Sequence, residues 1–213
     1  MKSRKVVTRS GRGFRGYIPS IKLKRMVEFE SLLERDAIML FELSPGIIKF
    51  QEQPEEVFYE EDGKLKRYYP DFELVLRSGE VLHVEVKPAQ KLRSPKLDKK
   101  MHAIASHYQS QNRDFRILTD QVVRQNPRFA NAKKLRTALH YERASDDSFL
   151  AIKNELSTNK SLSVRHLEAM FGSNTILSHL AHGELQCDLE MDLRSPFNFV
   201  RITKDSDHDA LYI

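Results

Sequence analysis

Two strand-forming runs joined by a tight turn constrain the fold of this 213-residue chain more than any other feature. The first run, residues 68–76, is rich in Tyr, Phe, Val and Leu, and the second, residues 81–87, alternates apolar and polar residues up to Pro88. The intervening Arg77-Ser78-Gly79 is typical of a turn. We therefore expect a hairpin-like strand pair inside a sheet.

The surrounding segments alternate between strand and helix patterns. Apolar residues at helical spacing predict a helix over residues 27–43, ended by Ser44-Pro45-Gly46. Asp36 falls inside the apolar arc of this helix, so we expect it to have a polar partner where it is buried. The other expected elements are strands at residues 47–50, 56–59 and 115–118 and helices at residues 95–111 and 128–140. This order predicts an α/β fold with a mixed sheet flanked by helices.

The pattern changes after Arg143, where the polar stretch 145–148 begins. The elements expected beyond it are three short helices near residues 148–157, 162–171 and 173–182 and short strands near residues 185–190 and 197–202. We interpret residues 145–213 as a small winged-helix-like domain that follows a main domain of residues 28–144.

Charge is distributed unevenly along the chain. The net charge of +5 combines a +9 segment at residues 1–27, which has no acid, with a −5 segment at residues 145–213. A basic, acid-free arm is suited to the phosphate backbone of DNA, whereas an acidic domain is not. We therefore predict that residues 1–27 bind DNA and that residues 145–213 dock a protein.

Composition excludes several classes of protein. No apolar run approaches the roughly 20 residues that a membrane-spanning helix needs, and the basic N-terminus leads into no apolar segment of a signal peptide. The lone Cys187 excludes an intrachain disulfide and a cysteine-rich zinc site. We expect a soluble intracellular protein with no membrane partner.

The strand at residues 81–87 also carries a chemical signal. Alternation directs His83, Glu85 and Lys87 to one face, and Asp71 opens the strand that pairs with it. Two neighbouring carboxylates repel each other, and a hard divalent cation such as Mg²⁺ or Mn²⁺ resolves that repulsion. Such an ion with an adjacent lysine suits phosphodiester hydrolysis. We expect His83 to be a polar neighbour of this site with no metal role.

Pro70-Asp71, followed after thirteen residues by Glu85-Val86-Lys87, resembles the PD-(D/E)xK nuclease pattern. The wider sequence resembles the TnsA-type endonuclease subunit of heteromeric cut-and-paste transposons. The stretches that carry the resemblance are residues 29–36 (FESLLERD), 50–54 (FQEQP), 69–72 (YPDF), 84–89 (VEVKPA) and 117–120 (ILTD).

The resemblance implies a restriction-endonuclease-like core that uses Mg²⁺ to nick the 5′ ends of the transposon. It also implies a TnsB-like DDE transposase and a TnsC-like regulatory ATPase as partners, double-stranded transposon-end DNA as substrate, and the bacterial cytoplasm as location. Asp71 and Glu85 would be metal ligands, Lys87 the catalytic lysine, and Glu34 the helix acid that completes the site. Helical spacing alone does not choose between Glu34 and Glu30.

Basic residues on both sides of these motifs are candidate contacts to the DNA backbone. The predicted DNA-binding residues are Arg4, Lys5, Arg9, Arg12, Arg15, Lys22, Lys24 and Arg25 in the arm and Lys91, Arg93, Lys96, Lys99 and Lys100 after the active-site strand. Two alternatives remain beside the transposase subunit: a free-standing restriction- or repair-type endonuclease, and a DNA-binding transposition scaffold without catalysis.

Overall fold

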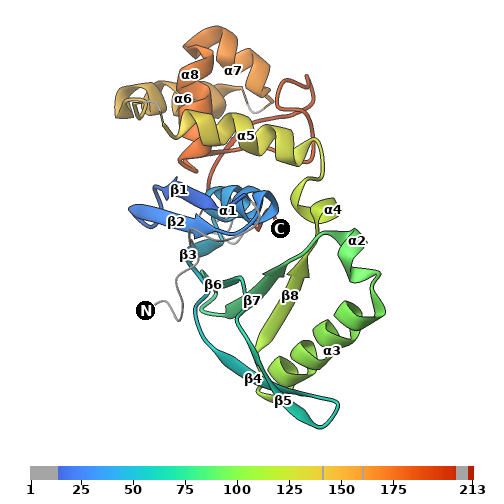
Figure 1. Cartoon of the computed structure of the whole chain (residues 1–213). Coiled ribbons are helices and arrows are strands. Elements are labelled where there is room, and N and C mark those ends of the chain that lie inside the picture. The colour runs from blue at the N-terminus through green and yellow to red at the C-terminus, as the bar shows by residue number, and fades with distance from the viewer. Residues whose placement is uncertain (1–13, 141, 160, 205–210) are drawn as a thin grey trace. The chain divides into compact units, whose positions relative to one another are not determined.

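The computed structural model describes residues 14–140, 142–159, 161–204 and 211–213, and it divides into two compact units. The first unit contains the described residues up to Glu42, then Gly46–Val123 and Ile213, and the second contains Leu43–Pro45 and Arg124–Tyr212. Each unit is described separately below (Figure 1).

A four-stranded mixed sheet forms the centre of the first unit, with strand order β3-β6-β7-β8. The strands are β3 (Ile47–Glu52), β6 (Phe72–Leu76), β7 (Val81–Val86) and β8 (Asp114–Leu118). β6 runs antiparallel to β3 and β7, whereas β8 runs parallel to β7. The parallel pair needs a crossover connection, which α2 (Ala89–Leu92) and α3 (Pro95–Ser110) supply. The predicted α/β class with a mixed sheet flanked by helices is confirmed.

The β6–β7 hairpin fixes the register on which the site depends. Phe72 lies opposite Val84, and Val75 lies opposite Val81. Gly79 adopts a φ of 90° in the connecting turn, a conformation that side chains with a Cβ rarely tolerate. The expected strand at 68–76 is wrong in its extent, because the chain leaves strand geometry between Tyr68 and Phe72, around Pro70, which has no N–H for a ladder.

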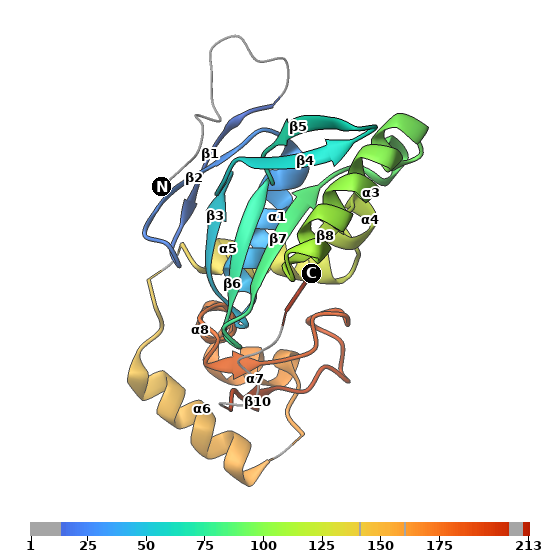
Figure 2. The same ribbon diagram turned by 90° about the horizontal axis from the view of Figure 1, so that it is seen from below.

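Helix α1 (Leu32–Leu43) covers one face of the sheet (Figure 2). The Phe41 ring packs on Phe50 of β3 and Phe72 of β6, with ring centroids 5.7 and 5.3 Å apart. Asp36 on this helix is 2% exposed and lies 2.8 Å from the Arg35 guanidinium, which supplies the expected polar partner.

The start of α1 differs from the prediction, because residues 25–29 form a strand. β2 (Arg25–Phe29) pairs antiparallel with β1 (Gly16–Ser20). Val27 and Phe29 are buried in strand alternation, and a Cβ on Gly16 would lie 2.9 Å from the Phe29 ring. Val27 and Phe29, whose spacing predicted an earlier start of the helix, therefore belong to a strand.

The opposite face of the sheet packs against α3 and a separate hairpin, β4 (Val57–Glu61) with β5 (Lys64–Tyr68). Aromatic and aliphatic residues of these elements form one core, which consists of Val57, Tyr59, Tyr68, Met101, Ile104 and Tyr108. Phe115 and Ile117 of β8 pack against it from the sheet. The face of β7 that carries Glu85 therefore lies under a second layer.

The second unit is mainly helical. Its helices are α5 (Arg128–Ala138), α6 (Asp146–Thr158), α7 (Val164–Phe171) and α8 (Ser173–Ala181), and the short strands β9 (Leu185–Gln186) and β10 (Arg201–Ile202) pair antiparallel. Helices α6, α7 and α8 and the strand pair occur where they were expected, with each strand only two residues long. Assignment to the winged-helix class stays a prediction.

Helix α5 is grouped with the second unit, whereas the short helix α4 (Asp120–Val123) ends the first. The buried Asn131 of α5 donates hydrogen bonds to the carbonyls of Leu189 and Met191, at 2.9 and 2.8 Å. These contacts tie α5 to the C-terminal segment. The domain limits 1–27, 28–144 and 145–213 stay predictions.

Candidate active site

Asp71 and Glu85 meet where β6 begins and β7 ends. Asp71 precedes β6 by one residue, and the hairpin register brings it beside the end of β7. The backbone N–H of Val86 donates to Asp71 Oδ2 at 2.8 Å, and the N–H of Gln53 donates to the Asp71 carbonyl at 2.9 Å. Both the side chain and the backbone of Asp71 are therefore fixed.

Lys87 bridges the two carboxylates. Its Nζ lies 2.7 Å from Glu85 Oε1 and 3.4 Å from Asp71 Oδ2. Its backbone N–H donates to the Leu118 carbonyl of β8 at 3.0 Å, which continues the parallel ladder past the end of β7. The structure thus brings Asp71, Glu85 and Lys87 together, as the strand pattern predicts.

Glu34 caps the helix that covers the other face of the sheet. Ser31 precedes α1 and its hydroxyl accepts from the Glu34 N–H, while Glu34 accepts from the Ser31 hydroxyl at 2.9 Å and from the Glu30 N–H at 2.7 Å. This is a variant of the capping box, in which Glu34 accepts from the N–H of Glu30 and from the Ser31 hydroxyl, where the usual box has the N–H of the N-cap residue as donor. Glu34 also interacts electrostatically with Lys87 and Asp71, whereas Glu30 pairs with Arg15 at 3.4 Å. Glu34 is the one of these two acids that lies within α1, and it interacts with two of the strand-pair residues.

Three carboxyl groups share the site with one lysine, and burial is the main cause of the pKa shifts of two of them. Burial, and next the charge of Glu85, raise the pKa of Asp71 well above its usual range despite the opposing effect of Lys87. Burial likewise raises the pKa of Glu34. Burial alone would lower the pKa of Lys87, but the charges of Asp71 and Glu85 raise it above its ordinary value. Lys87 is therefore a permanent cation among three carboxyl groups.

Tyr68 is a site residue that sequence reasoning missed. Its hydroxyl donates to Glu85 Oε2 at 2.5 Å, and the side chain is 4% exposed. Its ring makes edge contacts with Tyr59 and Phe115. The expected strand at 68–76 concealed this role, because Tyr68 belongs to the β4–β5 hairpin that folds over the sheet.

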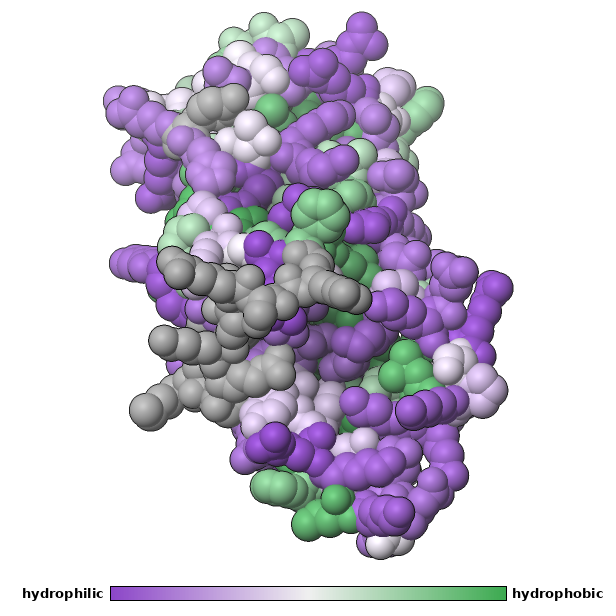
Figure 3. Space-filling model, viewed as in Figure 1, coloured by the Kyte–Doolittle hydropathy of each residue, from purple (hydrophilic) through white to green (hydrophobic). Residues whose placement is uncertain are grey.

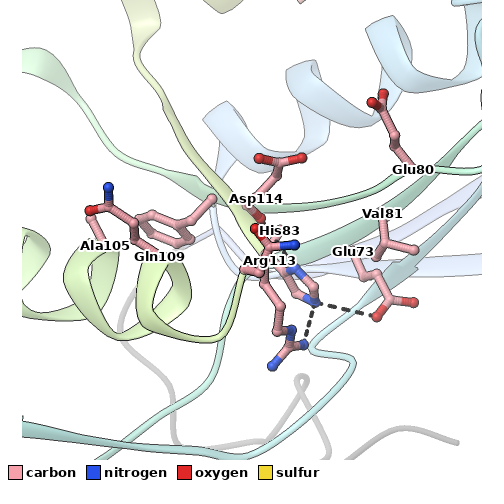
Figure 4. Close-up of a pocket in the computed structure, with 10 residues that line it drawn as sticks. Glu73, Glu80, Val81, His83, Ala105, Gln109, Arg113 and Asp114 are labelled. Carbon is pink, nitrogen blue, oxygen red and sulfur yellow. Dashed lines mark hydrogen bonds and ion pairs between the residues drawn. The ribbon is translucent and has the colours of Figure 1, made fainter.

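His83 belongs to a second polar group on the same face. Its Nε2 lies 2.8 Å from Arg113 and 3.4 Å from Glu73 (Figure 4). The His83 ring lies 4.8 Å from that of Tyr108. A cavity of about 840 Å³ lies at this group. Asp71, Glu85 and Lys87 do not line it, so it is separate from the site of the paired carboxylates.

The donor chemistry of the site fits a hard divalent cation. Asp71, Glu85 and Glu34 offer carboxylate oxygens, which Mg²⁺ and Mn²⁺ prefer, and their excess charge is what a cation would neutralise. Within the part of the chain that the structure describes, no three His, Cys, Asp or Glu side chains form a ready metal-binding group. The site is thus chemically suited to a metal without being a preformed cage.

The predicted DNA-binding residues of the arm have different surroundings. Arg4, Lys5, Arg9 and Arg12 lie outside the described residues. The Lys22 ammonium donates to the carbonyls of Phe41 and Ile47, at 2.8 and 2.5 Å. Arg25 forms two hydrogen bonds to Glu52, at 2.7 and 2.6 Å, while Lys24 is exposed. Their contact with DNA stays a prediction.

The basic residues after β7 are mostly at the surface. Lys91, Arg93, Lys96 and Lys99 are exposed, and Lys99 lies 2.5 Å from Asp62. Lys100 is half-buried, with its ammonium 5.5 Å from the centre of the Tyr68 ring. Figure 3 shows a mainly hydrophilic surface over this part of the first unit.

Comparison with known families agrees with this geometry. Residues 44–120 match the family described as TnsA-like endonuclease N terminal, a span that includes Asp71, Glu85 and Lys87. A search of curated proteins found no match. The resemblance to TnsA-type endonucleases is therefore confirmed over this span. In the residues that the structure describes, no helix is long and apolar enough to cross a membrane.

Proposed function

We propose that the chain is a metal-dependent DNA endonuclease subunit of a heteromeric cut-and-paste transposase, because residues 44–120 match the TnsA-like endonuclease N-terminal family. Its reaction is the hydrolysis of one phosphodiester at each 5′ end of the transposon. The observation that supports this most strongly is the cluster of Asp71, Glu85 and Lys87 inside the matched domain.

The ion would be Mg²⁺ or Mn²⁺, held by Asp71 and Glu85 with Glu34 as the third acid. When bound, such an ion lowers the pKa of a water molecule and neutralises charge on the phosphate. Lys87 keeps its proton because its pKa is raised, so it is suited to stabilise the anion that develops on the phosphate oxygens. The Val86 N–H and the Tyr68 hydroxyl orient the two strand carboxylates.

The partners in this proposal are double-stranded transposon-end DNA, a TnsB-like DDE transposase that processes the 3′ ends, and a TnsC-like regulatory ATPase. The C-terminal segment 145–213 carries −5 and is suited to dock one of these proteins, because phosphate contact needs positive charge.

A cleavage assay tests the proposal. Transposon-end DNA is incubated with Mg²⁺ or Mn²⁺, with and without the transposase, and wild type is compared with Asp71→Asn, Lys87→Met and the exposed-surface control Lys49→Gln. We expect metal-dependent 5′ nicking that needs the transposase, is lost in both site variants and persists in the control. Cleavage without any partner would indicate the free-standing nuclease instead.

A second outcome separates catalysis from scaffolding. DNA binding without cleavage by wild type, in the presence of transposase and either metal, would indicate the scaffold. Undiminished cleavage by Asp71→Asn and Lys87→Met would refute the site.

A further inference from the structure

A basic cleft lies between the β4–β5 hairpin and the beginning of α3. Its volume is about 510 Å³, and its cationic lining residues are Lys66, Arg67, Lys96 and Lys100. Glu61 is the acid among the residues that line it. The cleft therefore has a net positive lining, contributed by two elements that are distant in sequence.

Part of this positive charge is accessible. Lys66 lies 2.8 Å from Glu61, so that pair is neutral. Arg67 is 64% exposed at its side chain, where it lies 3.2 Å from Glu56. Lys96 is exposed, and within the described residues it has no recorded ion pair. An exposed cation is available to exchange its solvent or surface partner for an anion.

The beginning of α3 adds neutral donors. Ser94 lines the cleft and precedes the 16-residue helix, and its side chain makes no capping hydrogen bond. The first N–H groups of a helix have no partner within the helix and favour negative charge, although Pro95 at the first position of α3 has no N–H to contribute. These N–H groups add to the attraction of an anion, which comes mainly from the lysines and the arginine.

One tyrosine connects the cleft to the paired carboxylates. The Lys100 ammonium lies 5.5 Å from the centre of the Tyr68 ring, and the hydroxyl of that ring donates to Glu85 at 2.5 Å. Lys100, which lines the cleft, and Glu85 therefore contact the same side chain, Tyr68.

We propose that the basic cleft binds a backbone phosphate of DNA that flanks the phosphate at Glu85 and Asp71. The proposal rests on the proposed endonuclease function for its catalytic meaning. Lys96 and Arg67 contact the phosphate from opposite walls, and Lys100 holds the Tyr68 ring beneath it. The exposed Lys91 and Arg93 of the preceding segment extend the same positive surface, which suits a continuous strand better than a small free anion.

Binding in EDTA tests the proposal without any cleavage. The probe is a double-stranded oligonucleotide of random sequence, titrated with the full chain at several salt concentrations. The variants are Lys96→Gln, Arg67→Gln and their combination, and the matched control is Lys49→Gln on β3. Melting temperatures verify that each variant is folded.

We expect each single variant to bind DNA several-fold more weakly, because it loses one phosphate contact. For the same reason, the slope of log K (the DNA association constant) against log salt concentration becomes less steep by about 1. In the double variant the slope becomes less steep by about 2, and Lys49→Gln changes neither the affinity nor the slope. Unchanged slopes in the cleft variants, or an equal loss in the control, would overturn the proposal.

Inorganic phosphate at matched ionic strength distinguishes a strand from a free anion. If phosphate removes the difference between wild type and the cleft variants, the cleft binds the free ion, and the assignment to DNA is wrong. None of these measurements needs a metal. If the chain binds DNA in this way but never cuts it, the proposed nuclease function is refuted and the proposed phosphate site is not.

Discussion

Glu85 is the residue at which the buried polar contacts of the site converge. One carboxylate oxygen accepts from Tyr68 and the other faces Lys87, and the residue is 3% exposed. A buried carboxylate with both oxygens engaged has one orientation, which a metal ligand or a catalytic group requires. Strand alternation predicts which way Glu85 points, but the donor comes from a different hairpin.

Tyr68→Phe tests this orientation. Loss of the hydroxyl leaves one Glu85 oxygen buried without its donor, which costs about 1–3 kcal/mol of folding free energy. We expect a lower melting temperature, a weaker affinity for Mn²⁺ in titration calorimetry and a reduced cleavage rate. Tyr59→Phe is the control, because its hydroxyl bonds to Glu61 on the hairpin. Equal effects of the two variants would show that Tyr68 has only a packing role.

Asp71→Asn tests the charge excess through the pH dependence of stability. Because the pKa of Asp71 is raised in the folded state, the folded chain binds this proton more tightly, and stability falls as pH rises above the unfolded value of about 4. Asparagine removes that loss and still accepts from the Val86 N–H. We expect the variant to melt higher than wild type at neutral pH in EDTA.

The control for this prediction is the same comparison at low pH. Below the unfolded pKa, Asp71 is protonated in both states and the advantage of asparagine disappears. A variant that is less stable than wild type at neutral pH would mean that the attraction of Lys87 outweighs burial and the repulsion from Glu85.

At the scale of elements, patterning predicts most strands and helices of the first unit and fails where two patterns overlap. Val27 and Phe29 fit the helical spacing of the residues that follow, but they alternate within β2, which pairs with the preceding strand β1. Two alternating apolar residues are too few to distinguish a strand from the start of a helix. In the first strand run, residues 68–76, the two overlapping patterns are the end of β5 and the start of β6, because the chain leaves strand geometry around Pro70.

The boundary between β2 and α1 is set by Ser31, so Ser31→Ala tests it. The substitution removes the acceptor for the Glu34 N–H and the hydroxyl that donates to Glu34. We expect a loss of about 1 kcal/mol in the free energy of unfolding, measured by urea titration. Ser78→Ala in the exposed β6–β7 turn is the control and should change stability by much less.

At the scale of the whole chain, the small net charge of +5 conceals segments of opposite sign. Local sequence predicts this division, as well as the proximity of Asp71, Glu85 and Lys87, because all three lie on one hairpin. It does not predict the basic cleft, because Lys66 and Lys96 are brought together by the packing of the β4–β5 hairpin against α3. A cluster of residues within one hairpin can therefore be predicted from the sequence, whereas a cluster that forms between elements distant in the sequence cannot.

The division of charge predicts which surfaces respond to charge reversal. Lys153 and Arg165 are exposed on α6 and α7, within an acidic segment that we expect to dock protein. Lys153→Glu and Arg165→Glu should therefore leave the DNA affinity of the full chain nearly unchanged, whereas Lys96→Glu should lower it and its salt dependence. Electrophoretic mobility shifts at physiological salt measure all three. If reversal on α6 or α7 weakened DNA binding as much as reversal at Lys96, the C-terminal segment would itself be a DNA-binding surface, and its negative charge would have to be offset locally by those two cations.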